Sequence, residues 1–150
     1  MKKIIPLLLV ALFATTIVSC SKDNEDLILG TWQLESRTFI NIGHPIDSRN
    51  QPVTEQGPNL TLTFNKDKTG IVSFDEDTAP FTYSISGDNI IFSMEMGLDY
   101  GKNTYTESYV IDKLENNEMI LSYTETDWYH EGQPDEVEYN HKTSLNFKKI

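Results

Sequence analysis

Hydrophobic and polar residues alternate with a period of two along most of the chain. The clearest case is segment 59–65, where Leu60, Leu62 and Phe64 alternate with threonines. Such alternation places apolar side chains on one face of a β-strand. The same period recurs in segments 31–39, 70–75, 81–86, 90–96, 105–112 and 119–123, and the chain closes on Leu145 and Phe147. No helical period follows residue 20, so the pattern predicts an all-β domain of about eight strands.

Most of these segments are joined by short turns, which favours antiparallel hairpins. Gly87-Asp88-Asn89 and segment 115–118 carry turn residues between two apolar runs. Sequential hairpins predict an up-and-down β-barrel, although a β-sandwich of the same strands would show the same pattern. The connections 40–58 and 128–135 are longer and contain Pro and Gly, so we expect loops there, where binding sites commonly lie.

One of the turns has the spacing of a calcium-binding loop. Segment 65–70, together with Glu76, matches the positions of the ligands and the glycine in such loops. Asn65 stands where a carboxylate is expected, and the flanking segments alternate as strands do. We therefore interpret this segment as a hairpin turn in which Gly70 adopts a positive φ.

The three histidines show no metal-binding spacing, and we expect neither a metal nor a cofactor.

The N-terminal segment predicts export from the cytoplasm. Lys2 and Lys3 precede an apolar run from Ile4 to Val18, and the only cysteine, Cys20, follows Ser19. The run is too short and wrongly flanked for a membrane-spanning helix, so we predict that residues 1–19 are a secretory signal peptide.

The end of that segment resembles the lipobox of bacterial lipoproteins. The resemblance implies that Cys20 is acylated, with palmitate among its chains, and becomes the mature N-terminus. The protein would then be held at a membrane by its lipid anchor. Residues 20–26 are polar and acidic after the cysteine, and we expect them to form a disordered tether.

The acidic tether also bears on the location of the protein. It resembles an export signal that brings some Gram-negative lipoproteins to the outer face of the outer membrane, which implies a surface-exposed outer-membrane lipoprotein of the cell envelope. An ordinary solvated linker is the alternative, and it leaves open whether the domain faces the periplasm or the cell surface.

The charge of the chain excludes one class of partner. The formal net charge is −11, which repels phosphate backbones and argues against nucleic-acid binding. Residues 27–150 suit one domain with one core. A single cysteine allows no internal disulfide, so apolar packing must stabilise this domain.

The first strand carries a family resemblance. In segment 29–34, Gly30 and Trp32 resemble the Gly-x-Trp signature of lipocalins. The resemblance, which covers residues 27–150, is to small lipocalin-like bacterial lipoproteins. It implies an eight-stranded barrel with the tryptophan packed across the closed end, covered by a basic residue of the last strand, either Lys148 or Lys149.

The same resemblance implies non-catalytic binding of a small hydrophobic or amphipathic ligand inside the barrel. Inward-facing aromatic and aliphatic residues of the central strands are the candidate lining, and each would serve equally well as core: Phe81, Tyr83, Phe92, Met94, Tyr109, Leu121 and Tyr123.

The alternative function is a surface interaction module with a filled barrel. It would bind a protein or a glycan through its long loops, with Trp128, Tyr129 and Tyr139 as aromatic anchors. We expect no enzymatic activity, since the chain carries no nucleophile or phosphate-binding motif. The acidic pair Glu136 and Glu138 is interpreted as a solvated strand edge.

Overall fold

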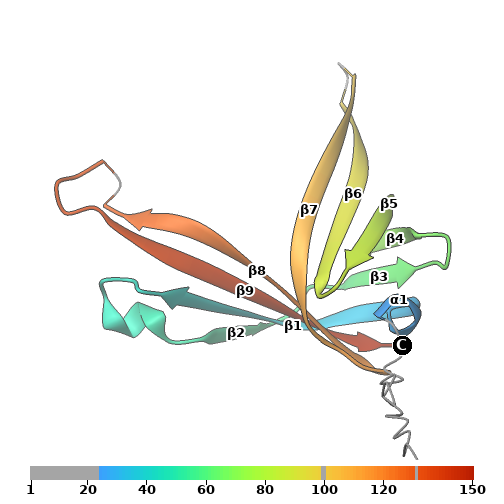
Figure 1. Ribbon diagram of the computed structural model, residues 1–150, viewed down its shortest axis with the longest axis horizontal. Coiled ribbons are helices and arrows are strands. Elements are labelled where there is room, and N and C mark those ends of the chain that lie inside the picture. The colour runs from blue at the N-terminus through green and yellow to red at the C-terminus, as the bar shows by residue number, and fades with distance from the viewer. Residues whose placement is uncertain (1–23, 99–100, 131) are drawn as a thin grey trace, which may run out of the picture.

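The computed structural model describes residues 24–98, 101–130 and 132–150, and its described part is dominated by β-strands (Figure 1). The signal segment and Cys20 lie outside the described residues. The strands are β1 (Gly30–Ile42), β2 (Val53–Gln56), β3 (Leu60–Phe64), β4 (Thr69–Phe74), β5 (Asp77–Ser86), β6 (Asn89–Leu98), β7 (Gly101–Leu114), β8 (Glu118–Tyr129) and β9 (Val137–Lys149). Within the described residues, no helix is long and apolar enough to cross a membrane.

Eight of the strands close into an antiparallel barrel, as the alternation predicted. The sheet runs in the order β2-β1-β3-β4-β5-β6-β7-β8-β9, and an additional pairing of β1 with β9 closes it. β2 lies outside this ring and pairs with β1 between Ser36 and Phe39. Since the first and last barrel strands are hydrogen-bonded to each other, the alternative of a β-sandwich is wrong.

One end of the barrel is plugged by the first strand and the residues before it. The Trp32 ring is fully buried, and its Nε1–H donates a 2.6 Å hydrogen bond to the carbonyl of Ile28. The helical turn α1 (Asn24–Leu27) leads into that position. The resemblance implied this role for Trp32, and the covering cation is Lys149, whose Nζ lies 5.0 Å from the centre of the indole.

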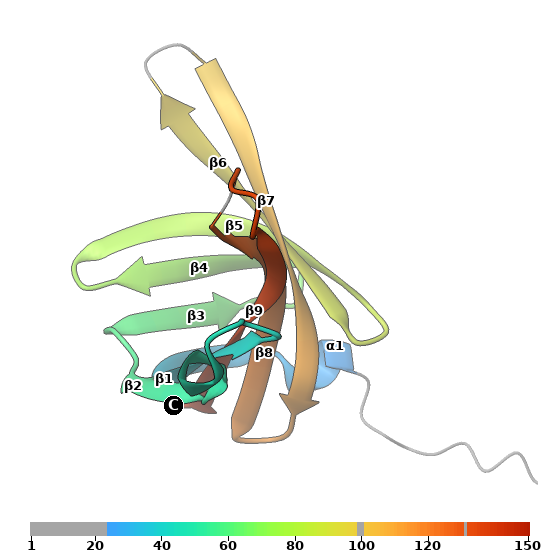
Figure 2. The ribbon, with the colours of Figure 1, turned by 90° about the vertical axis from the view of Figure 1, so that its left-hand side faces the viewer.

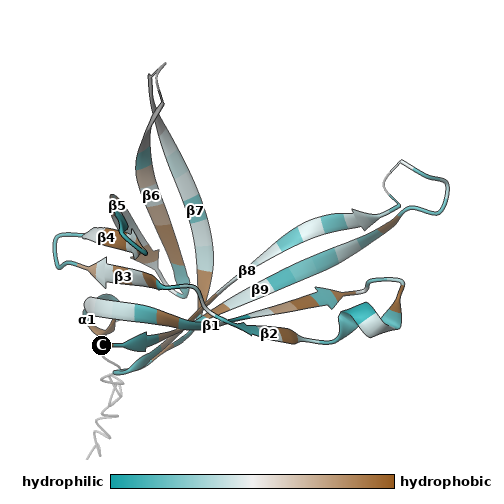
Figure 3. Cartoon of the chain, turned by 180° about the vertical axis from the view of Figure 1, so that it is seen from behind, coloured by the Kyte–Doolittle hydropathy of each residue, from teal (hydrophilic) through white to brown (hydrophobic). Residues whose placement is uncertain are grey.

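The opposite end of the barrel flares, because β7 and β8 separate. Their pairing covers only Val110–Leu114 of β7 and Met119–Ser122 of β8. Beyond it, β7 continues in a long hairpin with β6, and β8 continues with β9. Figure 1 shows these two hairpins diverging, and in Figure 2 the β6–β7 hairpin projects above the other strands. Seen from behind in Figure 3, β6 carries hydrophobic residues, whereas the outer parts of β8 and β9 are largely hydrophilic.

The turn between β3 and β4 corrects a detail of the sequence interpretation. Segment 65–70 does form a hairpin turn, but the positive φ of 66° belongs to Lys68 and not to Gly70. Gly70 is needed for a different reason, since a Cβ atom there would stand 2.2 Å from the Phe81 ring. The glycine therefore permits close packing of β4 against a core phenylalanine.

Two segments expected to lack regular structure are partly ordered. The connection 40–58 includes the end of β1, the 3₁₀ helix η1 (Asp47–Asn50) and strand β2. Residues 24–26, expected as part of a disordered tether, belong to α1, and Glu25 forms a 2.8 Å ion pair with Lys68. For residues 24–26 the structure thus shows a helical turn where the sequence led us to expect part of a disordered tether.

Candidate functional site

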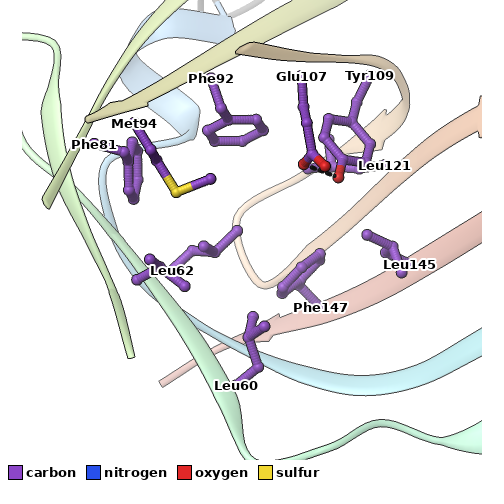
Figure 4. Close-up of a pocket in the computed structure, with 11 residues that line it drawn as sticks. Leu60, Leu62, Phe81, Phe92, Met94, Glu107, Tyr109, Leu121, Leu145 and Phe147 are labelled. Atoms are coloured by element: carbon purple, nitrogen blue, oxygen red, sulfur yellow. Dashed lines mark hydrogen bonds between the residues drawn. The ribbon is translucent and has the colours of Figure 1, made fainter. Parts of the chain in front are cut away.

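The barrel contains an apolar cavity of about 180 Å³ that is partly open to solvent. Its lining comes from β3 to β9, with apolar side chains almost throughout, and consists of Leu60, Leu62, Val72, Phe81, Phe92, Met94, Glu107, Tyr109, Leu121, Leu145 and Phe147 (Figure 4). An apolar cavity with very few polar groups is typical of sites for small hydrophobic molecules.

Five of the seven candidate lining residues do line this cavity: Phe81, Phe92, Met94, Tyr109 and Leu121. Tyr83 does not. It is buried in the core, and its hydroxyl donates a 2.8 Å hydrogen bond to the carbonyl of Asn65 in the β3–β4 turn. Tyr123 lies beside the cavity, at the opening described below. Ligand binding by any of these residues stays a prediction.

A row of aromatic rings connects the core to the opening. Phe92 packs edge-on against Phe81 at 5.3 Å between ring centres and against Tyr109 at 5.6 Å. Tyr109 in turn meets Tyr123 at 5.4 Å with the ring planes perpendicular. Edge-to-face pairs of this kind stabilise one another beyond the area they bury. The row therefore gives one wall of the cavity a defined shape.

Sequence reasoning missed Glu107, the one charged residue among the described residues that line the cavity. The alternation contained the signal, because on β7 the same face carries Tyr105, Glu107 and Tyr109 at every second position. The prediction selected only apolar residues on that face. It also left out Leu60, Leu62, Val72, Leu145 and Phe147, which line the cavity from other strands.

Two tyrosines hold the Glu107 carboxylate in place. The Tyr109 hydroxyl donates a 2.6 Å hydrogen bond to Oε2, and the Tyr105 hydroxyl donates a 2.8 Å hydrogen bond to Oε1. Figure 4 shows Glu107 and Tyr109 meeting beside Leu121. Burial, and then the hydrogen bond to Glu107, strongly raise the pKa of Tyr109. Its phenol therefore stays protonated and continues to donate to the carboxylate.

A second hollow adjoins the cavity where β7 and β8 separate. It has a volume of about 280 Å³, and we call it the β7–β8 opening. Its lining is Tyr105, Glu107, Ser108 and Tyr109 of β7 with Tyr123, Thr124 and Glu125 of β8. Glu107 and Tyr109 border both spaces, so the opening leads directly to the polar edge of the apolar cavity.

The aromatic residues proposed as surface anchors lie further out, near the ends of β8 and β9. Two of them enclose His44, whose ring centre lies 5.1 Å from that of Tyr129 and 4.7 Å from that of Tyr139. His44 is only 3% exposed. These two tyrosines are thus half-buried against His44, whereas Trp128 is 41% exposed. Binding of a protein or glycan there stays a prediction.

Within the described residues, no group of three or more His, Cys, Asp or Glu side chains could hold a metal ion.

The two residues of the acidic pair, Glu136 and Glu138, have different surroundings. Glu136 accepts a 2.6 Å hydrogen bond from the backbone N–H of Gly132 within the β8–β9 turn, and Glu138 is exposed on β9.

Comparison with known proteins gives a consistent result. The family model described as lipocalin-like domain matches residues 28–121. The solved structure of insecticyanin from the tobacco hornworm Manduca sexta is similar, with a TM-score of 0.50 and 12% sequence identity, over 83% of this chain and 62% of that chain. This chain thus spans less than two thirds of the insecticyanin chain, and the likeness concerns the fold. No curated protein matches the sequence.

Proposed function

Because the chain belongs to the lipocalin-like domain family, we propose that it is a non-catalytic carrier that binds a small hydrophobic or amphipathic ligand inside its barrel. The observation that carries the proposal is the apolar cavity, whose described lining includes one carboxylate, that of Glu107. The described residues that surround it are otherwise aliphatic and aromatic, apart from the Tyr109 hydroxyl.

The size of the cavity limits the ligand. Its volume of about 180 Å³ is close to that of engineered apolar cavities of about 150 Å³ that accept benzene. One aromatic ring or a short alkyl segment would therefore fill it. Larger ligands would have to extend into the β7–β8 opening, where polar side chains can contact a head group.

Native mass spectrometry tests the proposal directly. The protein purified from its own host is compared with a denatured sample, and we expect a small molecule that is released on denaturation. Met94→Trp should abolish this adduct, because the indole would occupy the cavity. Ile91→Trp is the matched control, since Ile91 lies on the same strand but is 39% exposed.

Either of two results would contradict the carrier proposal. One is a bare protein mass accompanied by no binding of small apolar probes. The other is an adduct that survives Met94→Trp while the variant retains its fold by circular dichroism, because the ligand would then bind outside the cavity.

We also propose that the carrier is lipid-anchored at the cell envelope, in the outer membrane, through Cys20. The support is the sequence, in which the only cysteine follows the apolar run and Ser19. Growth with labelled palmitate should label the protein, and Cys20→Ser should remove the label and release the domain from the membrane fraction. Ser21→Ala should retain both. Label on the Cys20→Ser variant would refute this anchor.

A further inference from the structure

The charged and aromatic groups at the β7–β8 opening are arranged in an unusual way for an apolar site. Glu107 of β7 and Glu125 of β8 both line it, together with Tyr105, Tyr109 and Tyr123. No Lys, Arg or His is among the described lining residues of either the opening or the cavity. The opening therefore combines negative charge with the faces and edges of three phenol rings.

The Glu107 carboxylate is set up to receive a further partner. Each of its oxygens accepts one phenol hydrogen bond, at 2.8 Å from Tyr105 and 2.6 Å from Tyr109. A carboxylate oxygen can accept about two hydrogen bonds, so each keeps capacity for a ligand group. The carboxylate thus offers hydrogen-bond acceptors at the polar edge of an apolar cavity.

We propose that the ligand is an amphipathic organic cation, whose apolar part fills the cavity and whose ammonium group lies in the β7–β8 opening between Glu107, Glu125 and the tyrosines. Carboxylates supply Coulomb attraction, and tyrosine rings attract cations through their π faces. The formal net charge of −11 favours the approach of a cation over that of an anion. This inference rests on the proposed carrier function and specifies the class of its ligand.

The competing ligand class is an organic anion, and one basic residue bears on it. Arg37 of β1 stands opposite Leu145, a lining residue, in the β1–β9 pairing. Its guanidinium forms a 3.0 Å ion pair with Glu55, so its charge is already compensated, although its Nε is buried without a hydrogen-bond partner. An anionic ligand would have to compete with Glu55 for the Arg37 guanidinium, and it would also have to approach the Glu107 carboxylate. Both effects disfavour binding of an anion.

Three probes with the same ring and different head groups separate these possibilities. Benzyltrimethylammonium is cationic, benzyl alcohol is neutral and phenylacetate is anionic. Their affinities are measured by equilibrium dialysis against the full protein in nanodiscs of zwitterionic lipid, with empty nanodiscs subtracted. We expect the cation to bind roughly tenfold or more tightly than phenylacetate, with benzyl alcohol between them.

Matched variants assign the preference to the carboxylate. Glu107→Gln should weaken binding of the cation about fivefold or more while benzyl alcohol changes by less than about twofold. Glu76→Gln is the control, because Glu76 is exposed in the β4–β5 turn and its loss changes the net charge equally. Tyr105→Leu provides a second variant at a position that is 45% exposed, so the fold should tolerate it, and cation binding should again weaken.

The outcomes distinguish this inference from the carrier function. The cation proposal would be overturned if phenylacetate bound as tightly as the cation or more tightly, or if Glu107→Gln kept the preference for the cation. In either case, binding of benzyl alcohol would still support the carrier function. If none of the three probes binds, the cation proposal fails, and a bare protein mass in the native spectrum would make the carrier proposal fail as well.

Discussion

Lys149 lies over the ring of Trp32, with its Nζ atom 5.0 Å from the ring centre. The two residues belong to β9 and β1, the last and the first strand of the barrel. Their contact therefore links these two strands at the plugged end of the barrel. The same Nζ donates a 3.4 Å hydrogen bond to the carbonyl of Leu27. The amine thus covers the indole and contacts the segment that leads into β1.

Replacing this amine should weaken the domain. Lys149→Met keeps the length of the side chain but removes the charge, and we expect the free energy of unfolding to fall by about 1 kcal/mol. Lys148→Met is the control, because Lys148 points to solvent near Glu35 at 3.8 Å and should change stability by less than about 0.5 kcal/mol. Urea denaturation measures both. Equal effects would show that the cation over Trp32 adds nothing.

The two tryptophans should differ sharply in their contribution to stability. Trp32→Phe replaces a buried indole by the smaller phenyl ring and removes the hydrogen bond to Ile28, so we expect a loss of about 2 kcal/mol. Trp128→Phe changes a ring that is 41% exposed, and we expect less than about 0.5 kcal/mol. Thermal unfolding followed by circular dichroism compares them. A loss of stability at Trp128→Phe as large as that at Trp32→Phe would contradict this expectation.

Gly70 should tolerate no side chain. In Gly70→Ala the new Cβ would meet the Phe81 ring at 2.2 Å and the Thr63 carbonyl oxygen at 2.5 Å, so we expect a destabilisation of about 2 kcal/mol. Phe81→Leu in the same chain should relieve part of this strain, and the two changes should be non-additive by at least about 0.5 kcal/mol. If the changes in unfolding free energy of the two substitutions were strictly additive in a double-mutant cycle, the close contact between position 70 and the Phe81 ring would be refuted.

Acid sensitivity should be detectable at the β3–β4 turn. The Thr69 hydroxyl donates a 2.6 Å hydrogen bond to Asp67, and this bond, with the Thr69 backbone N–H, lowers the Asp67 pKa below its ordinary value of 3.8. A carboxyl whose pKa is lower in the folded state stabilises the fold above its unfolded pKa. That contribution disappears as the pH falls through the folded pKa.

Thr69→Val removes the hydroxyl donor and keeps the shape of the side chain. The Asp67 pKa, followed by NMR of its carboxyl carbon, should rise toward 3.8, and the loss of stability below about pH 4 should become shallower. Thr78→Val, on the exposed edge of β5, is the control. An unchanged Asp67 pKa in Thr69→Val would show that the hydroxyl does not stabilise the anion.

Much of the fold followed from the alternation, because an apolar residue at every second position can be buried only by a strand with one face on a core. Leu60, Leu62 and Phe64 illustrate this in β3. β2 escaped prediction for the same reason, since all four of its residues are exposed. It is held by pairing with β1, and an edge strand that buries nothing leaves no hydrophobic pattern.

The candidate site was predicted in part. Phe92, Met94 and Leu121 were found because inward-facing apolar residues in a barrel must line either a core or a cavity. Tyr83 was assigned to the same wall, but its hydroxyl is drawn to the Asn65 carbonyl. Glu107 was missed because a charged residue on an inner face becomes acceptable only once Tyr105 and Tyr109 are seen to donate to it.

The sequence by itself determined which segments other than β2 form strands, which faces most of those strands bury, and that Trp32 is part of the core, since these depend on local period and on the hydrophobic effect. Only the tertiary structure decided that β1 meets β9, that Lys149 covers Trp32 in place of Lys148, and that β7 and β8 separate to leave an opening beside Glu107. Each of these depends on the register between strands far apart in the chain, and a change of one residue in register exchanges the buried and the exposed face.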